Sequence, residues 1–129
     1  MSSMQEINLQ GSKVLVTGSA RGLGESFARA LVAAGAQVTI SDVLHERGQA
    51  LASELGASAA YVPLDLLDPA GIRAGVDAAA QAMGGLTGLI NNAAITNSGG
   101  KTMDELATDM WDRVMDVNVR GTWLVTQAA

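Results

Sequence analysis

The 129-residue sequence is long enough for one domain with a buried core, and its 48% hydrophobic content argues against disorder. The net charge of −5, with eight scattered Lys and Arg residues, argues against binding to nucleic acid or to an anionic membrane surface. The absence of cysteine excludes disulfides and thiolate metal sites, and no metal site is expected. The opening MSSMQEINLQGSK is not a signal peptide and no stretch is apolar enough to cross a bilayer, so we expect a cytoplasmic protein.

Apolar runs that suit β-strands alternate with helical patterns along the chain. The runs KVLVT, QVTIS, AAYVP and GLIN predict strands over residues 13–17, 37–41, 59–63 and 88–91. Helices are predicted from residue 23 to Gly35, over about 45–55, from Asp68-Pro69 to Met83, and from about Thr108 to the last residue. One apolar face of the first helix is expected to turn inward: Leu23, Phe27, Ala30, Leu31 and Ala34.

This alternation is typical of βαβ units. It predicts an α/β fold with a parallel sheet covered by helices on both faces, because the strands are short and mostly apolar. No linker or composition break divides residues 1–129, which we interpret as part of a single domain. A flavodoxin-like or receiver-like regulatory domain would share the alternation. Receiver domains, however, need clustered acidic residues after the first strand, where this chain has glycines.

The glycine-rich stretch TGSARGLG, residues 17–24, lies between the first strand and the first helix. Gly18 allows a sharp turn off the strand, Gly22 leaves room for a phosphate near the backbone, and Gly24 lets the helix approach the sheet. Free N–H groups at the helix start would hold a pyrophosphate. A tight turn without a ligand is the alternative. The expected cofactor-binding residues of this loop are Gly18, Ser19, Arg21, Gly22, Leu23 and Gly24.

An acidic residue after the second strand supports a dinucleotide. Asp42, followed by Val43, comes 18 residues after Gly24, where a carboxylate can accept hydrogen bonds from the adenosine ribose hydroxyls. Its charge would repel a 2′-phosphate, so NAD is predicted over NADP. Arg21 favours the opposite choice, because a guanidinium can pair with a phosphate. Asp42 could also serve as a helix N-cap, and the two roles can coexist.

With these motifs in place, the chain resembles the short-chain dehydrogenase/reductase family from about residue 10 to residue 129. Residues Thr17 to Gly24 match the family's T-G-x-x-x-G-x-G in full. The resemblance implies a Rossmann-type doubly wound sheet, of which the first four strands are present in the order 3-2-1-4. It also implies an adenine site at Asp65 and Leu66, and a cofactor-binding N-N-A segment at Asn91, Asn92 and Ala93.

The activity that the resemblance implies is NAD(H)-dependent oxidation of a secondary alcohol or reduction of a ketone. The family carries out this reaction on small molecules and as a homo-oligomer, either a dimer or a tetramer. Asn118 matches the family's helix asparagine, whose backbone holds a water in a proton relay. Without the relay's lysine, Asn118 would only be a satisfied polar residue that kinks the helix.

The sequence departs from the family pattern in two ways. Ala94 replaces the last glycine of N-N-A-G, which is tolerable if its φ is negative. The family's catalytic serine and Tyr-x-x-x-Lys have no match, since Tyr61 is the only tyrosine and Lys13 and Lys101 are the only lysines. We therefore interpret residues 1–129 as the cofactor half of a longer domain. The alternative is a truncated, non-catalytic nucleotide-binding module.

Other side chains have simpler interpretations. His45 is expected at the surface, and Glu46 and Arg47 on a solvated helix face. Trp111 and Trp123 are expected to pack or to form an interface, and the fourth strand to be an exposed sheet edge. A loop near the substrate side contains two expected turn formers, Asn97 and Ser98.

Overall fold

The computed structural model describes residues 6–96 and 100–129, so Asn97 and Ser98 lie outside the described residues. Within this part of the chain, four strands form a parallel sheet in the order β3-β2-β1-β4. The predicted fold class and strand order are confirmed. The strands are β1 (Lys13–Thr17), β2 (Gln37–Asp42), β3 (Ala59–Pro63) and β4 (Gly88–Ile90).

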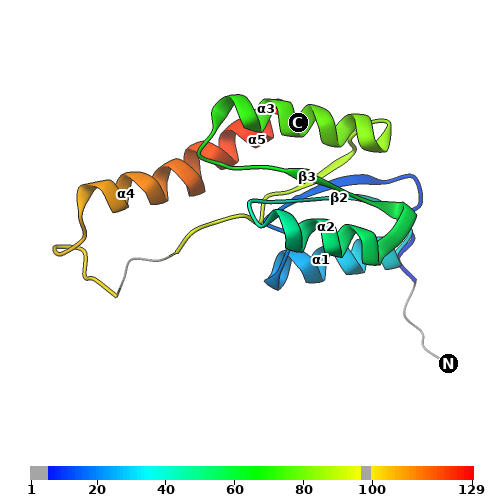
Figure 1. Cartoon of the computed structure of the whole chain (residues 1–129), viewed down its shortest axis with the longest axis horizontal. Coiled ribbons are helices and arrows are strands. Elements are labelled where there is room, and N and C mark those ends of the chain that lie inside the picture. The colour runs from blue at the N-terminus through cyan, green and yellow to red at the C-terminus, as the bar shows by residue number, and fades with distance from the viewer. Residues whose placement is uncertain (1–5, 97–99) are drawn as a thin grey trace.

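Helices cover both faces of this sheet (Figure 1). On one face lie α1 (Gly22–Ala33) and α2 (His45–Leu55), the latter followed by the short η1 (Gly56–Ser58). On the other face lie α3 (Pro69–Met83) and α5 (Thr122–Ala128). The π-helical η2 (Asp116–Gly121) joins α5 to the preceding helix α4 (Thr108–Met115). In Figure 1, α4 projects away from the sheet. Among the described residues no helix combines the length and the apolarity that a membrane crossing requires.

The predicted helix boundaries rest on recognisable caps. Asp68 caps α3, its Oδ1 accepting a hydrogen bond of 3.1 Å from the N–H of Gly71, and Pro69 follows at the first position. Gly84 ends the helix at φ 73° and Gly35 follows α1 at φ 100°, conformations that favour glycine. The sequence signals for these ends are confirmed.

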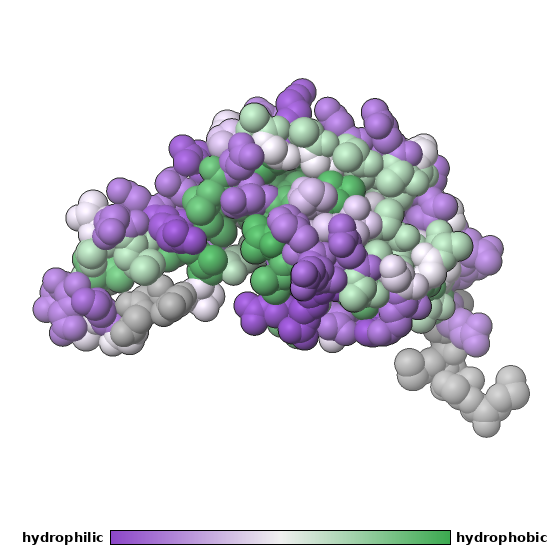
Figure 2. Space-filling model, in the orientation of Figure 1, coloured by the Kyte–Doolittle hydropathy of each residue, from purple (hydrophilic) through white to green (hydrophobic). Residues whose placement is uncertain are grey.

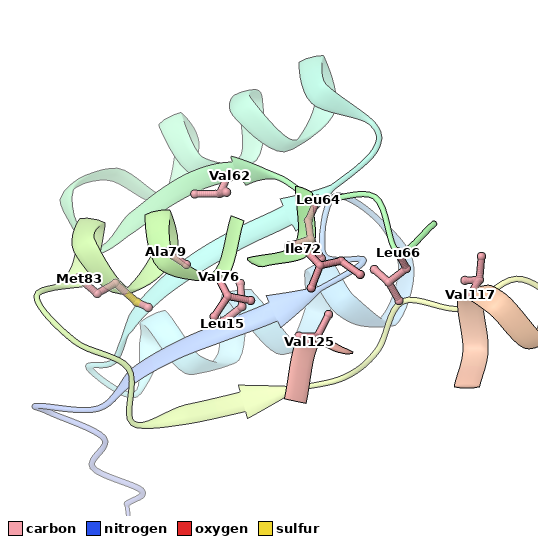
Figure 3. Close-up of a cluster of buried hydrophobic side chains, with 10 residues drawn as sticks. All are labelled: Leu15, Val62, Leu64, Leu66, Ile72, Val76, Ala79, Met83, Val117 and Val125. Atoms are coloured by element: carbon pink, nitrogen blue, oxygen red, sulfur yellow. The ribbon is translucent and has the colours of Figure 1, made fainter. Parts of the chain in front are cut away.

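The core consists of one apolar cluster on each side of the sheet. Figure 3 shows the cluster beneath α3, where Leu15 of β1 meets Ile72 and Val76 of α3, and Val125 approaches from α5. The second cluster lies beneath α1 and α2 and includes Val16 and Ile40, both fully buried. Adjacent strand residues thus supply opposite faces, as a sheet covered on both sides requires.

The prediction for the buried face of α1 is wrong for three of its five residues; Leu31 and Ala34 are half-buried, and Leu31 packs against the core cluster as expected. Leu23 is 70% exposed, Phe27 is 37% exposed and Ala30 is also exposed, whereas Gly24 and Ala28 are buried. A Cβ atom at Gly24 would lie 2.2 Å from the carbonyl oxygen of Gly18. The start of the helix therefore approaches the glycine loop too closely for a large side chain on that face, and Leu23 and Phe27 are exposed, whereas Leu31 packs against the core from the last turns.

The hydroxyl of Thr39 gives a stability prediction. Thr39 is fully buried in β2, and its Oγ1 has no hydrogen-bond partner among the described residues. Thr39→Val keeps the branched shape and removes the unsatisfied group, so we expect the free energy of unfolding to rise by about 1 kcal/mol in urea denaturation. The matched control is Thr17→Val, because the Thr17 Oγ1 accepts two backbone hydrogen bonds, each of 3.0 Å. That control should lose stability, and a loss in Thr39→Val as well would contradict the prediction.

Candidate functional site

The glycine loop is held tightly between β1 and the segment after β4. Gly18 has φ 62°, and a Cβ atom there would lie 2.8 Å from the Cα of Ala93. The amide of Asn92 donates to the Gly18 carbonyl at 3.0 Å. Gly22 also has φ 62° but faces open space, with nothing within 4 Å of a Cβ atom. Of these two loop glycines, Gly22 is therefore the one whose backbone a ligand could approach without obstruction.

The start of α1 carries no side-chain cap. Its N-cap residue, Arg21, makes no capping hydrogen bond with its side chain. The first N–H groups of a helix lack intrahelical acceptors, and the helix dipole places partial positive charge there. The loop therefore presents donors and positive potential to an anionic group.

Ser19 is buried beneath the glycine loop and does not face the cavity. Its side chain is fully buried, its hydroxyl donates to the carbonyl of Val16 at 2.8 Å, and it accepts from the N–H of Ser41 at 3.0 Å. These bonds join the ends of β1 and β2. Ser19 thus holds the loop in position and does not line the cavity.

The carboxylate of Asp42 is fixed by backbone donors. Its Oδ2 accepts from the N–H of Ala20 at 3.0 Å, and its Oδ1 accepts from the N–H groups of Val43 and Leu44 at 2.8 and 3.2 Å. The N-cap of α2 is Leu44, so Asp42 is not that helix's cap. Three of about four acceptor positions are occupied, which leaves one for a hydroxyl donor from the cavity.

A third group of candidate site residues follows the ends of β3 and β4. Leu66 is buried, and the exposed Asp65 accepts from the N–H of Leu67 at 2.9 Å. Asn92 and Ala93 are tied to Thr17 by their backbone N–H groups. Asn91 lies apart, because its amide donates to the hydroxyl of Thr126 on α5.

Asn118 fastens the loop after β4 to the π-helical turn. Its Oδ1 accepts from the N–H of Ile95 at 2.8 Å and its Nδ2 donates to the carbonyl of the same residue at 2.7 Å. The oxygen and the nitrogen of this side-chain amide thus both have hydrogen-bond partners within the chain. Ala94 lies in this loop, and no described residue other than glycine has a positive φ, so its methyl group is accommodated without strain.

These elements enclose a cavity of about 650 Å³ at the carboxyl ends of the strands. It lies at the hollow between the projecting helix and the body of the molecule, where Figure 2 shows green, apolar surface. Nine of the predicted residues line the cavity: Gly18, Arg21, Gly22, Asp42, Val43, Asp65, Leu66, Asn92 and Ala93. Five predicted residues lie outside its lining: Ser19, Leu23, Gly24, Asn91 and Asn118.

The sequence interpretation missed two cationic residues of the cavity. Arg47, expected on a solvated face of α2, and Arg113 of α4 line it together with Arg21. Arg47 lies in the first turns of the helix that follows Asp42, which is the signal that could have identified it. Three guanidinium groups in a chain of net charge −5 provide a local attraction for phosphates. No group of three or more His, Asp and Glu residues among the described residues could hold a metal ion.

Comparison with known proteins agrees with this geometry. The model of the short chain dehydrogenase family matches residues 12–129, and the chain belongs to that family. A curated relative, 3-alpha-(or 20-beta)-hydroxysteroid dehydrogenase of Mycobacterium tuberculosis, is 48% identical over 93% of this chain and 45% of its own length. Sorbitol dehydrogenase of Cereibacter sphaeroides is 38% identical, over 95% and 47% respectively. The chain thus spans about half the length of these relatives.

Solved structures show the same half of a longer fold. A 3-ketoacyl-(acyl-carrier-protein) reductase from Brucella melitensis, complexed with NADH, superposes with a TM-score of 0.89 and 33% identity over 93% of this chain and 49% of the other. A gluconate 5-dehydrogenase from Burkholderia cenocepacia, in complex with NADP and tartrate, gives 0.86 and 34% over 95% and 49%. These two structures thus contain nicotinamide cofactors of both kinds, NADH in the first and NADP in the second.

Two glycines of the loop should respond differently to alanine. Gly24→Ala introduces a methyl group against the Gly18 carbonyl and should lower the free energy of unfolding by about 3 kcal/mol. Gly22→Ala meets no atom and carries only the strain of its positive φ, about 1 kcal/mol. Urea unfolding of both variants measures the difference. Equal losses would contradict the close helix approach described above.

Proposed function

We propose that this chain is the cofactor-binding part of an NAD(H)-dependent oxidoreductase that interconverts a secondary alcohol and a ketone. The observation that carries the proposal is the fixed carboxylate of Asp42 at the cavity wall. Family membership and the dehydrogenases among the relatives support the reaction class. When bound, the nicotinamide would supply the hydride chemistry.

The preference for NAD follows from where negative charge is held. Three backbone N–H groups hold the Asp42 carboxylate, so it cannot turn away from a 2′-phosphate of about −2 charge. Arg21 and Arg47 could offset part of that repulsion, but both are exposed and lose side-chain entropy when they pair. A fixed carboxylate accepting from a ribose hydroxyl is therefore the favoured arrangement.

The remaining chain residues have binding and positioning roles in this proposal. The uncapped start of α1 and the open space at Gly22 would seat the pyrophosphate, and Asp65 with Leu66 would border the adenine. Asn118 keeps the loop after β4 in place through Ile95, and its backbone role in a proton relay stays a prediction.

The acid–base pair would have to come from outside these 129 residues. Tyr61 lies within β3 and does not line the cavity, and no lysine is spaced four residues after it. This observation favours a second description of the chain by itself, a nucleotide-binding module without turnover. The substrate-binding part, the particular alcohol or ketone and the cytoplasmic location stay predictions.

Replacing the carboxylate tests the cofactor. Asp42→Ala should weaken NAD binding by about tenfold or more, because a hydrogen bond to a charged group is lost. NADP binding should weaken less or improve, since the repulsion disappears. Isothermal titration calorimetry with both nucleotides measures the ratio, with Asp77→Ala on the exposed side of α3 as the control. An unchanged NAD affinity in Asp42→Ala would contradict the proposal.

We also propose that the C-terminal helices lie in an interface, either between copies or with further residues of the whole protein. Trp111 and Trp123 are 54% and 58% exposed, and Val119 between them is 54% exposed. Light scattering coupled to size-exclusion chromatography should show the 129-residue chain as an oligomer, and a double change, Trp111→Lys with Trp123→Lys, should shift it towards monomer. Ile7→Lys, at an apolar residue 75% exposed near the other end, is the control. A monomeric unaltered chain would argue against an interface between copies of these residues.

A further inference from the structure

Tyr61 lies behind the candidate ribose site and outside the cavity lining. It belongs to β3, opposite Ile40 of β2, and packs in the core cluster beneath α2. Its ring is pressed against Gly48, where a Cβ atom would lie 2.1 Å from the Cε1 of the tyrosine. The first residue of α2, His45, meets the ring edge-on, with centroids 6.1 Å apart. The ring is therefore held between the strand and the start of the helix.

The Tyr61 hydroxyl reaches the backbone of the residue that carries the site's carboxylate. It donates to the carbonyl oxygen of Asp42 at 2.8 Å, and the N–H of Leu64 donates to the same oxygen at 3.2 Å. The Nδ1 of His45 lies 2.7 Å from the hydroxyl oxygen. Because the single hydroxyl proton points to Asp42, the imidazole must be the donor in this second bond.

This network fixes the peptide from which the Asp42 carboxylate extends. The side chain of Asp42 is held by N–H groups on two sides, from the glycine loop at Ala20 and from the following turn at Val43 and Leu44. A shift of the Asp42 carbonyl would move the carboxylate relative to the loop. Burial, with the nearby Asp42 charge, raises the pKa of Tyr61, so the hydroxyl keeps its proton at neutral pH.

We propose that Tyr61, supported by His45, is a positioning residue that orients the Asp42 carboxylate towards the ribose hydroxyl and thereby contributes to cofactor selectivity. The inference rests on the proposed function, because it needs Asp42 to bind a ribose. It assigns Tyr61 a role that requires its hydroxyl and not only its ring. A tyrosine whose role was packing alone would affect every nucleotide equally or none.

The experiment separates positioning from packing. Tyr61→Phe keeps the ring and removes the hydroxyl, and NAD should bind about fivefold more weakly, as expected for one net hydrogen bond. The 2′-deoxy analogue of NAD should bind with unchanged affinity, because it lacks the hydroxyl that Asp42 accepts. Calorimetry on the protein measures both. In an Asp42→Ala background, Tyr61→Phe should produce no further loss.

Thr87→Val is the matched control, since it removes a hydroxyl that accepts from the N–H of Lys13 at the opposite end of the sheet. It should leave NAD affinity unchanged. Should Tyr61→Phe fail to fold, His45→Ala provides the same comparison, with the tyrosine intact and a smaller loss of the same kind.

These measurements test the positioning role of Tyr61 separately from the proposed NAD site at Asp42. Equal weakening of NAD and its 2′-deoxy analogue, or no weakening of NAD, overturns the positioning role while a loss in Asp42→Ala still supports the NAD site. An Asp42→Ala variant with unaltered NAD affinity overturns both.

Discussion

The hydrogen bond from the N–H of Ala20 to the carboxylate of Asp42 is the contact on which the rest of the site depends. It joins the glycine loop, which follows β1, to the end of β2, 22 residues further along the chain. Beside it, the buried Ser19 hydroxyl bonds both strands, so the loop is fixed by two routes. The Asp42 carboxylate is thus a structural acceptor, and in the proposed function it is also the ligand for a ribose hydroxyl. The same interaction that stabilises the turn therefore fixes this carboxylate at the cavity wall.

On the opposite side of the loop, hydrogen bonds are combined with close backbone packing. Thr17 accepts two N–H groups from the segment after β4, and the amide of Asn92 binds the Gly18 carbonyl. These contacts leave no room for a Cβ atom at Gly24, so α1 must lie close to the sheet. The three glycines of one motif thus have different physical roles. Two serve backbone packing, and only Gly22 keeps space for a ligand.

Local signals, namely strand alternation, helix caps and glycine spacing, were sufficient for the elements, the parallel sheet and the cavity residues of the glycine loop. The strand order and the cavity residues after β3 and β4 followed from the family resemblance. The sequence interpretation failed where the outcome depended on distance between elements. The apolar residues Leu23 and Phe27 suggested a buried stripe, yet the helix approaches too closely for them to face inward. Arg113 could not be assigned, since only the projection of α4 brings it to the cavity. Asn118 was expected as a satisfied polar residue, and its side chain does bond the backbone of Ile95, 23 residues earlier, from within a π-helical segment.

The residues proposed to bind the nucleotide lie within this chain, whereas an acid–base pair for proton transfer does not. The proposed nucleotide site consists of strand ends and the start of α1, which contacts among residues 17–95 hold together. Proton transfer would need groups that face the nicotinamide from another direction, which the single tyrosine in β3 cannot do. Its hydroxyl instead donates to the Asp42 carbonyl, where the proposed role of Tyr61 is to position the carboxylate. The edge strand β4, half-buried along its length, and the exposed Trp111 and Trp123 on the C-terminal helices are the surfaces that suit contact with further protein.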